Sequence, residues 1–419
     1  METSMQVVII GNSAAGLSAL EAFRKLDTSS SVHVISREGP SPYARVQIPY
    51  YLKDRIKLDN LYIRETDYFN DLNAEMIEGR VSALDMTTHS VILEDGRAIA
   101  FDRLLIASGS TPTMPSITGI DSAGIHHIWT MDDALALKPA FEAARRILII
   151  GGGFIAMQAA WAATQCKLSV MVVVRSTIMR RDLDDQAREL MKRSMVDHGV
   201  SLIEGEMPCK IVENTDRSLT VEFPDRQPVE VDNVVVATGV QPNTAFLGGS
   251  GIAIDGGVLV NRHMQTNIPG IYAAGDVAAA TTSDGRNHMV RALWPCAAEQ
   301  GEVSGTNLAG GKATYQGSLN MNVTELFGLV VASMGRFADT DGKQVWKYGA
   351  PSQGNYLSVV LEDGIPIGCL SVGGPDGSAI LGMLRPYIRQ QKYLGMERPD
   401  DLAQALPLRL FPATLNKPA

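Results

Sequence analysis

The sequence predicts an α/β fold with two parallel sheets, each covered on both faces, followed by a C-terminal α+β domain. A pattern of strand, glycine-rich turn and helix occurs twice, beginning at Gln6 and again at Arg146. Each copy later reaches an apolar strand that ends in Ala-x-Gly, at residues 104–109 and 234–239. Short apolar strands that alternate with helices are typical of parallel sheets buried on both faces.

The pattern changes after Gly301, and from about residue 318 onward it is that of strands and one helix. Strands are expected near residues 356–361 and 367–372 and an amphipathic helix over 379–394, with no further glycine-rich turn. This arrangement indicates a separate α+β domain. The sequence therefore predicts three domains: a discontinuous domain at 1–112 and 241–317, a second domain inserted at 113–240, and a third at 318–419.

The composition is that of a globular protein. The 419 residues are 45% hydrophobic and 20% charged, and a chain of this length is expected to form two or three cores. No apolar run reaches the roughly 18 residues of a membrane span, and the first strand begins too early to follow a cleavable leader. We therefore expect a cytoplasmic protein without a membrane span. The net charge of −9 argues against nucleic acid as a partner.

The first glycine-rich turn, within residues 7–16, has the spacing of a dinucleotide phosphate cradle. Gly11 permits the sharp turn, Ser13 is small enough for close phosphate approach, and Gly16 lets the helix pack on the strand. The helix N-terminus then presents free N–H groups to a pyrophosphate. The predicted cradle residues are Gly11, Ser13, Ala14, Ala15 and Gly16.

Two acidic residues are candidate ligands of hydroxyl groups. Glu38 follows the strand at 32–35, at a distance from Gly16 where a carboxylate holds ribose hydroxyls, although Ser36 and Arg37 intervene. Asp276 follows Gly275 in the string TNIPGIYAAGDV at 266–277, and in a flavin site it would accept hydrogen bonds from the ribityl chain. An Asp that caps a helix is the alternative, but it does not explain the whole string.

Together these motifs resemble the pyridine nucleotide-disulfide oxidoreductase superfamily, in the branch with NADH:rubredoxin reductases, ferredoxin reductases and the flavin part of nitrite reductases. The resemblance covers nearly the whole chain and implies two Rossmann-like, glutathione reductase-like domains, with FAD in the first cradle. It places Arg45, in the string Pro-Tyr-Ala-Arg at 42–45, beside the flavin. It also places Trp294 and Pro295 at the start of a helix directed at the pyrimidine end of the flavin, where a positive helix end stabilises reduced flavin.

The second glycine-rich turn is predicted to bind NADH or NADPH. Gly151 and Gly153 form the turn, Phe154 and Ile155 follow, and Ala156 fills the third glycine position. The Ala-x-Gly strand ends are assigned to the two cofactor sites as Ala107, Ser108 and Gly109 in the first copy and Gly239 in the second.

The strand at 168–174 ends at an arginine rather than an acid. An acid there binds the 2′-hydroxyl of NAD, whereas Arg175 accommodates the 2′-phosphate of NADP, and Arg180 and Arg181 follow. Arg175 with Arg181 resembles the arginine pair of NADPH-using glutathione reductases. The pattern favours NADPH, but a solvated basic turn that tolerates either nucleotide stays open.

The expected redox thiols are missing. The four cysteines are Cys166, Cys209, Cys296 and Cys369, whose spacing gives neither a redox pair nor a metal site. In the single-cysteine branch of the superfamily the thiol precedes a Pro-Tyr-Tyr stretch, and here that position resembles Val46. Thiol-based reduction is therefore not expected, and Cys296 is predicted to be structural.

Gln158 is a second departure from the family pattern. Glutathione reductase-like sequences carry a Glu there that pairs with a lysine near flavin N5, so a neutral amide indicates a different way of gating nicotinamide access. With Arg45 and Trp294, Gln158 completes the predicted catalytic residues.

The resulting hypothesis is an FAD-dependent NAD(P)H oxidoreductase that moves hydride between nicotinamide C4 and flavin N5. Without a thiol relay, the favoured electron partner is a protein or subunit with an iron–sulfur centre, such as a ferredoxin, or a rubredoxin-type carrier. A stand-alone NAD(P)H oxidase that reduces O2 and a low-turnover sensing or structural subunit are the alternatives. The direction of electron flow stays open, as does the choice between a homodimer and a larger redox complex.

The predicted C-terminal helix carries a basic stripe. Arg385, Arg389 and Lys392 would share one face and could dock an acidic carrier, with a solvated helix face as the alternative. Pro386 is expected to kink a helix that begins before it.

Overall fold

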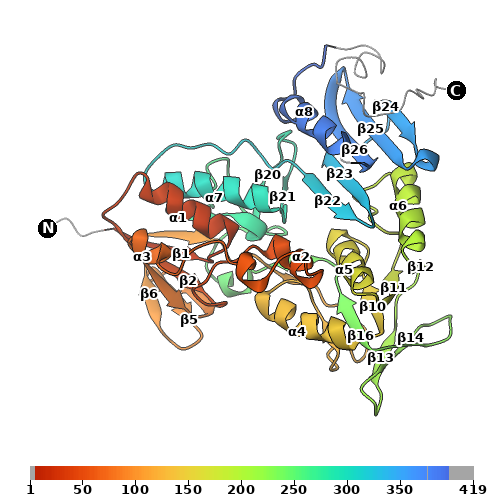
Figure 1. The fold of residues 1–419 in the computed structure, drawn as a ribbon. Helices are drawn as coiled ribbons and strands as arrows, with labels where there is room; N and C mark the ends of the chain where they lie inside the picture. The colour runs from red at the N-terminus through yellow and green to blue at the C-terminus, as the bar shows by residue number, and fades with distance from the viewer. Residues whose placement is uncertain (1–4, 375, 396–419) are drawn as a thin grey trace. The chain divides into compact units, whose positions relative to one another are not determined.

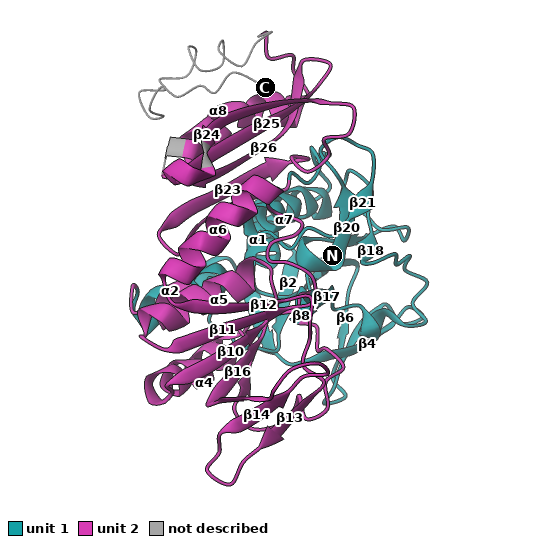
Figure 2. Cartoon of the chain, turned by 90° about the vertical axis from the view of Figure 1, so that its right-hand side faces the viewer, with its two compact units in different colours: residues 1–47, 56–111, 240–319 teal, residues 48–55, 112–239, 320–419 magenta. Residues whose placement is uncertain are grey.

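Figure 1 shows the protein as a computed structural model, which describes residues 5–374 and 376–395. The chain forms two compact units (Figure 2). Unit 1 holds Met1–Gln47, Ile56–Thr111 and Val240–Leu319, and unit 2 holds Ile48–Arg55, Pro112–Gly239 and Asn320–Ala419. The C-terminal residues therefore group with residues 112–239, and the division into three domains stays a prediction.

Unit 1 is built on a five-stranded parallel sheet. Its strands, in sheet order, are β19 (Ile271–Ala273), β7 (Arg103–Ile106), β1 (Gln6–Ile10), β2 (Ser31–Ser36) and β3 (Ala74–Glu78). The central strand β1 is apolar on both faces, because each face is covered, and its Val7, Val8 and Ile9 are inaccessible to solvent.

The two faces of this sheet are covered by different layers. Helices α1 (Ala14–Arg24) and α7 (Trp294–Leu308) pack on the face with Val7 and Ile9, whereas an antiparallel sheet packs on the face with Val8 and Ile10. The strands of that second sheet are β4 (Val81–Asp85), β5 (Ser90–Leu93) and β6 (Ala98–Ala100). The sequence predicted that both faces are covered but did not predict this small sheet.

The remaining elements of unit 1 are short. They are η1 (Arg45–Gln47), η2 (Leu58–Leu61), α3 (Tyr68–Asp71), β8 (Ser110–Pro112), β17 (Val240–Pro242), η3 (Ala245–Leu247), β18 (Val258–Leu259), η4 (Gly275–Val277), β20 (Ala278–Thr281) and β21 (His288–Met289).

Unit 2 repeats the design. Its parallel sheet has the order β12-β11-β10-β16-β9, and an antiparallel sheet of β13, β14 and β15 covers the face with Leu148 and Ile150. The elements are α2 (Ile48–Leu52), β9 (Ile125–His126), α4 (Met131–Ala143), β10 (Arg146–Ile150), α5 (Phe154–Gln165), β11 (Ser169–Val174), α6 (Asp185–Asp197), β12 (Val200–Glu204), β13 (Lys210–Glu213), β14 (Leu219–Glu222), β15 (Val229–Val231) and β16 (Asn233–Val236).

The C-terminal part of unit 2 is a five-stranded antiparallel sheet with one helix, which confirms the predicted α+β pattern. The strand order is β22-β23-β26-β25-β24, and α8 packs on the sheet through Ile380, Leu384 and Ile388. The elements are β22 (Met321–Leu326), β23 (Leu329–Gly335), β24 (Gln344–Ala350), η5 (Pro351–Gln353), β25 (Asn355–Glu362), β26 (Ile365–Gly373) and α8 (Asp376–Gln390). The strands predicted at 356–361 and 367–372 are β25 and β26.

One expectation about the last helix is wrong. Helix α8 ends at Gln390, because Gln391 has a positive φ of 49°, so Lys392 lies beyond the helix and the predicted three-residue stripe does not form on it. Pro386 lies inside the helix, about three turns from its start, and the kink expected there stays a prediction. Arg385 and Arg389 remain one turn apart.

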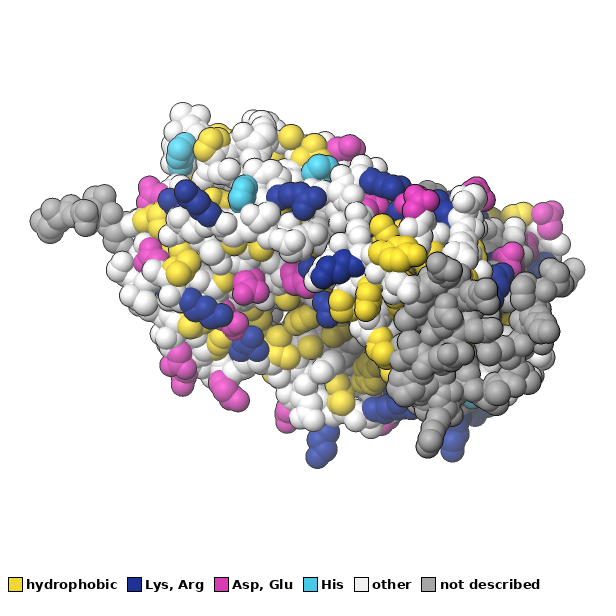
Figure 3. All heavy atoms as spheres, turned by 90° about the horizontal axis from the view of Figure 1, so that it is seen from above, with side chains coloured by type: hydrophobic (Ala, Val, Ile, Leu, Met, Phe, Trp, Pro, Cys, Tyr) yellow, Lys and Arg dark blue, Asp and Glu magenta, His cyan; other side chains and the backbone are white. Residues whose placement is uncertain are grey.

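None of the helices in the described part of the chain is long and apolar enough to cross a membrane. On the face shown in Figure 3, Lys and Arg side chains are interspersed with Asp and Glu.

Helices α1 and α7 approach each other closely because glycines of one face the backbone of the other. A Cβ atom on Gly301 would lie 2.2 Å from the carbonyl oxygen of Ala15, and one on Gly305 would lie 2.1 Å from that of Ala19. Ala15 and Ala19 lie four positions apart on α1, as Gly301 and Gly305 do on α7. The facing surfaces of the two helices therefore carry no side chain larger than a methyl group at these positions. The N-terminal ends of both helices are thereby fixed relative to each other.

Replacing Gly305 with Ala should lower the melting temperature, because the new methyl group has no space and the helices must separate. Overpacking of this kind costs about 1–3 kcal/mol. The matched control is Gly382→Ala in α8, where a Cβ meets no atom within 4 Å, and where Ala should be neutral or stabilising by up to about 1 kcal/mol. Equal melting temperatures for Gly305→Ala and wild type would show that the helices are not packed this closely.

Candidate functional site

The turn between β1 and α1 is shaped by two glycines. Gly11 has a φ of 110°, and a Cβ there would lie 2.2 Å from the carbonyl oxygen of Ala107. A Cβ on Gly16 would lie 1.9 Å from the carbonyl oxygen of Gly11. Any side chain at either position would push the helix away from the end of the sheet. Ser13 takes the N-cap position of α1, as the predicted cradle requires.

The turn between β10 and α5 repeats this geometry. Gly151 has a φ of 137°, and a Cβ there would lie 2.1 Å from the carbonyl oxygen of Ala237. Gly153 takes the N-cap position and is open, because a Cβ on it would meet no atom within 4 Å. Ala156 is fully buried behind the turn. The repeat seen in the sequence is therefore also a repeat of backbone contacts.

The N-termini of the helices differ in how their free N–H groups are satisfied. Thr130 caps α4 and Asp184 caps α6, each by accepting a hydrogen bond from a backbone N–H group. In contrast, α1, α5 and α7 have no side-chain cap. Their first N–H groups are available to an outside acceptor, which is the feature that a pyrophosphate or an electron-rich ring requires. The residues present therefore fit FAD in unit 1 and a nicotinamide nucleotide in unit 2.

Asp276 lies where α1 and α7 converge. A Cβ on Gly275 would contact the Cβ atoms of Ala15 and Ala297, at 3.1 and 3.6 Å. The backbone N–H of Gly275 donates to Oε1 of Gln300 (2.8 Å), a side chain that is 1% exposed. These contacts fix the peptide that carries Asp276. Gln300 was not among the predicted site residues.

The cost of burying the negative charge of Asp276 is only partly offset by its hydrogen bond and by nearby positive charge. Burial raises its pKa, while a hydrogen bond from Ser110 Oγ (2.8 Å) and the charge of Arg45 oppose that shift without cancelling it. A buried carboxylate in this condition gains from additional hydroxyl donors, because they stabilise its charged form. The ribityl chain of a flavin supplies such donors. Ser110 was not predicted, although it directly follows the Ala-Ser-Gly strand end.

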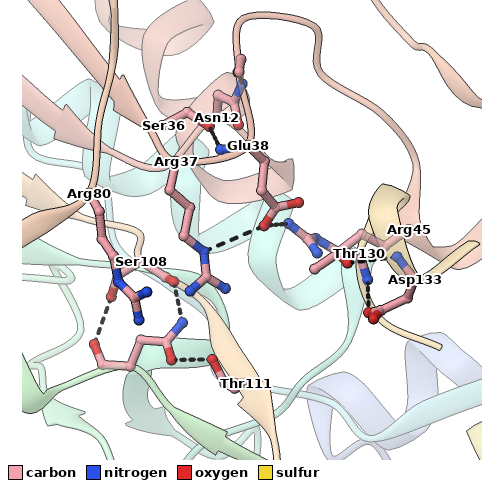
Figure 4. Close-up of polar contacts among 12 residues, drawn as sticks. Asn12, Ser36, Arg37, Glu38, Arg45, Arg80, Ser108, Thr111, Thr130 and Asp133 are labelled. Atoms are coloured by element: carbon pink, nitrogen blue, oxygen red, sulfur yellow. Dashed lines mark hydrogen bonds and ion pairs between the residues drawn. The ribbon is translucent and has the colours of Figure 1, made fainter. Parts of the chain in front are cut away.

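Glu38 and Arg45, predicted separately, form one ion pair. Nη2 of Arg45 lies 2.7 Å from Oε1 of Glu38, and the hydroxyl of Tyr43 donates to Oε2 of Glu38. Figure 4 shows Arg45 and Arg37 directed at this carboxylate. Burial works to raise the pKa of Glu38, but the charge of Arg45 and these hydrogen bonds lower it overall. Glu38 is therefore an ionised acceptor whose remaining lone pairs can take ribose hydroxyls.

Ser108 has a structural partner in the same unit. Its hydroxyl donates to the backbone oxygen of Asn243 (2.9 Å), and the amide of Asn243 donates back to the backbone oxygen of Ser108 (2.8 Å). Thr111 donates to the same side chain at 2.7 Å (Figure 4). Ser108 thus shapes the strand end through Asn243, while Gly109 beside it has a φ of 69° and no atom near a Cβ position.

Trp294 and Pro295 form the first turn of α7, as predicted. Trp294 is half-buried and packs against the core that contains α1, and Pro295 is exposed. Cys296 follows them and is buried, with Sγ 3.6 Å from the carbonyl oxygen of Leu319. None of the four cysteines forms a disulfide, and no cluster of metal-ligating side chains occurs within residues 5–374 and 376–395. Val46, which the resemblance places at the thiol position of the single-cysteine branch, is 52% exposed.

Unit 2 holds the other predicted residues. Gly239 has a φ of 114°, and a Cβ there would meet no atom within 4 Å. Arg175 and Arg181 are exposed in the loop after β11. Ile155 is exposed in the first turn of α5. Phe154 opens that helix and is half-buried. Nε2 of Gln158 donates to the hydroxyl of Thr324 on β22 at 3.1 Å, a partner that no sequence pattern indicated.

Comparison with known proteins agrees with this geometry. The model of the pyridine nucleotide-disulphide oxidoreductase family matches residues 5–301. The epsilon subunit of an NADH-dependent phenylglyoxylate dehydrogenase from Aromatoleum evansii is 28% identical over 358 residues, which cover 84% of this chain and 85% of that subunit. The ferredoxin–NAD(+) reductase component of a p-cumate 2,3-dioxygenase system from Pseudomonas putida is 26% identical, with 97% and 98% of the two chains covered.

A solved structure with the same fold is an engineered water-forming NADPH oxidase bound to NADPH. It superposes with a TM-score of 0.86 at 24% identity, and the match covers 96% of this chain and 98% of the oxidase.

Replacing Asp276 with Asn should weaken FAD binding about tenfold to a hundredfold, because a charged acceptor of ribityl hydroxyls becomes neutral. FAD binding to the wild type should also tighten as the pH rises through the raised pKa of the free site, since hydroxyl donors favour the ionised carboxylate and binding releases a proton. The Asn variant should lose this dependence. Titration of apoprotein with FAD, followed by flavin fluorescence, measures both effects.

The control is Asp255→Asn, a change at an exposed carboxylate of the same unit, which should leave FAD affinity unchanged. Wild-type affinity and pH dependence in Asp276→Asn would remove Asp276 from the site.

Proposed function

Because this chain belongs to the pyridine nucleotide-disulphide oxidoreductase family, we propose that it is an FAD-dependent NAD(P)H oxidoreductase that exchanges electrons with a partner protein containing an iron–sulfur centre. When bound, FAD supplies a two-electron carrier that exchanges hydride with nicotinamide and electrons with the acceptor. The observation that carries the proposal is the pair of glycine cradles, each opening onto an uncapped helix N-terminus.

The chain's own residues have distinct roles in this proposal. The N–H groups of α1 and α5 hold the two pyrophosphates, and Asp276 and Glu38 hold polyol hydroxyls. Arg45 keeps Glu38 ionised and adds positive charge near Asp276. The N-terminus of α7, at Trp294 and Pro295, stabilises negative charge on the reduced ring. Gln158, held by Thr324, borders the nicotinamide end.

The proposed electron partner follows from the missing thiols. By resemblance, the exposed Val46 stands where the single-cysteine branch of the family has its thiol, and Cys296 and Cys369 are buried. Electrons must therefore be passed on without a disulfide. One relative is a ferredoxin–NAD(+) reductase component, which supports an iron–sulfur protein as partner. Another is the epsilon subunit of a dehydrogenase, which supports a role as one subunit of a redox complex. A cytoplasmic location is part of the same proposal.

A second candidate function is direct reduction of O2. The observation that favours it is the likeness in fold to a water-forming oxidase, which covers 96% of this chain. The two functions share the hydride half-reaction and differ only in the acceptor.

We further propose that NADPH is the preferred nucleotide. The engineered NADPH oxidase carries five substitutions, to Ala, Ala, Arg, Ser and Arg, separated by 18, 1, 1 and 5 positions. The same intervals separate Ala156, Val174, Arg175, Ser176 and Arg181 here, and four of the five residue types are the same. Arg175 and Arg181 then supply the positive charge that a 2′-phosphate requires.

The proposed function is tested by mixing the oxidised holoprotein with NADPH or NADH in the absence of oxygen and following the flavin absorbance. Rapid bleaching supports an oxidoreductase, and no bleaching with either nucleotide excludes it. Reoxidation by a ferredoxin or rubredoxin that is much faster than reoxidation by O2 supports the partner protein, while the reverse order supports the oxidase.

No cysteine should be required for the reduction of the flavin. A variant with Ser at positions 166 and 209 and Ala at the buried positions 296 and 369 should be reduced at close to the wild-type rate, because none of the thiols accepts the hydride. If Cys296→Ala alone abolishes the bleaching while FAD remains bound, the thiol-free mechanism is wrong.

Replacing Arg175 or Arg181 with Ala should raise the KM for NADPH and leave that for NADH almost unchanged. Each charge-assisted contact with phosphate is worth about 1.5–3 kcal/mol, or roughly tenfold to a hundredfold. The control is Arg193→Ala on α6, where the arginine pairs with Glu189 instead. A wild-type protein that strongly prefers NADH would refute the preference for NADPH.

A further inference from the structure

The loop that follows β11, here called the arginine loop (residues 175–183), carries three exposed arginines. Arg175, Arg180 and Arg181 have no ion-pair partner among the described residues, although the protein has 46 acidic side chains. The next basic residues along the chain are all paired: Arg188 with Asp185, Lys192 with Glu204 and Arg193 with Glu189. The positive charge of the loop is therefore left for an outside anion.

The start of the arginine loop is anchored by a carboxylate from the neighbouring strand. Glu204 ends β12 and lies in register with Val174, the last residue of β11. Its Oε1 accepts hydrogen bonds from the hydroxyl of Thr177 and from the backbone N–H of Ile178 (3.0 Å). These contacts fix the backbone two and three residues after Arg175.

Further hydrogen bonds hold the middle and the end of the loop. Arg188 on α6 donates to the carbonyl oxygens of Ile178 (3.0 Å) and Leu183 (2.7 Å). The N–H of Met179 donates to the carbonyl oxygen of Gly152 (2.6 Å), which ties the loop directly to the phosphate cradle. Ile178, Met179 and Leu183 are buried. The loop is therefore a fixed platform rather than a solvated turn.

The end of the loop is fixed by Asp184. Its Oδ1 caps α6 by accepting from the N–H of Ala187 (3.0 Å), and its Oδ2 accepts from the hydroxyl of Tyr356 (2.6 Å). Both ends of the loop therefore have carboxylate anchors, one from β12 and one at the start of α6.

A carboxylate beside a phosphate site would ordinarily repel the phosphate. Here Lys192 lies 2.5 Å from Oε2 of Glu204 and neutralises it. Burial works to raise the pKa of Glu204, but Lys192, Thr177 and the N–H of Ile178 lower it overall, so Glu204 is an ionised acceptor with each oxygen engaged. Glu204 therefore acts on the loop mainly through its hydrogen bonds to Thr177 and Ile178, and its charge contributes less because Lys192 neutralises it.

We propose that Glu204 is a positioning residue for nucleotide selectivity, which holds Thr177 and Ile178 so that the arginine loop presents its guanidinium groups to a 2′-phosphate. This inference rests on the proposed preference for NADPH. Glu204 does not touch the phosphate, and the preference depends on it because an unanchored loop must be ordered when the nucleotide binds.

The test measures the binding of 2′,5′-ADP and of 5′-AMP to the FAD-loaded protein by titration calorimetry. These probes differ only in the 2′-phosphate and need no turnover. Glu204→Ala should weaken the binding of 2′,5′-ADP about tenfold and leave 5′-AMP almost unchanged, because a hydrogen-bonded anchor is lost. Glu204→Gln should retain most of the preference, because its amide oxygen can still accept from Thr177 and Ile178.

A second pair of variants protects the test against misfolding of Glu204→Ala. Thr177→Val removes the hydroxyl that donates to Glu204 and should reduce the preference for 2′,5′-ADP several-fold, while Thr177→Ser keeps the donor and should restore it. The control is Glu206→Gln, two residues further along, where the carboxylate pairs with Arg226 and no change is expected.

The outcomes separate the competing explanations. If Glu204 acts through its charge, both Glu204→Ala and Glu204→Gln strengthen the binding of 2′,5′-ADP, and the proposal is overturned. It is also overturned if Glu204→Ala and Thr177→Val keep the wild-type preference, or if the wild type binds both probes equally. Failure of NADPH and NADH to reduce the flavin would refute the proposed oxidoreductase function, while the two probes would still decide the role of Glu204.

Discussion

The shape of both nucleotide cradles depends on close backbone contact between a turn glycine and the carbonyl group at the end of a neighbouring strand. In unit 1 the contact joins Gly11 to Ala107, and in unit 2 it joins Gly151 to Ala237. A side chain at either glycine would overlap a backbone oxygen, so the helix that follows could not begin at the sheet edge. Because the helix begins there, its unpaired N–H groups face the space above the sheet, where a pyrophosphate can accept from them. The glycines of α7 extend the same principle, since they bring a second helix N-terminus to the peptide that carries Asp276.

The two carboxylates around the flavin cradle differ in how far nearby donors and positive charges stabilise their ionised form. Glu38 has both an arginine and a tyrosine hydroxyl as partners and is held ionised, whereas Asp276 has one serine hydroxyl and the more distant charge of Arg45. A buried carboxylate with few hydrogen-bond donors binds added donors more strongly than a carboxylate whose oxygens already have partners. In the proposed function, this difference gives Asp276 the larger share of the hydroxyl recognition, and we expect the affinity of its site for FAD to depend on pH.

The second unit uses carboxylates in another way. Glu204 and Asp184 hold loop backbone and helix ends, and their charges are balanced by nearby donors. The arginine loop that these carboxylates hold carries Arg175, Arg180 and Arg181, which have no ion-pair partner among residues 5–374 and 376–395. The loop is tied to the phosphate cradle by the hydrogen bond from the N–H of Met179 to the carbonyl oxygen of Gly152, so these cations belong to the same unit as the proposed nucleotide site. The absence of a thiol at Val46 complements this arrangement, because electrons delivered at the nucleotide site must leave the flavin by transfer to another molecule.

The sequence by itself determined the two cradles, their order, the strands that end at them and the α+β character of the C-terminal part. These features depend on residues close together in the chain, because a turn glycine, an N-cap and an alternating strand each follow from local sterics and periodicity. Only the tertiary structure decided that small antiparallel sheets cover one face of each parallel sheet, that α8 ends before Lys392, and which partners the site residues have. Ser110 meets Asp276 across 166 positions and Gln158 meets Thr324 across the same separation. No local pattern encodes such pairs, since they form only when distant strand ends and helices are brought together by packing.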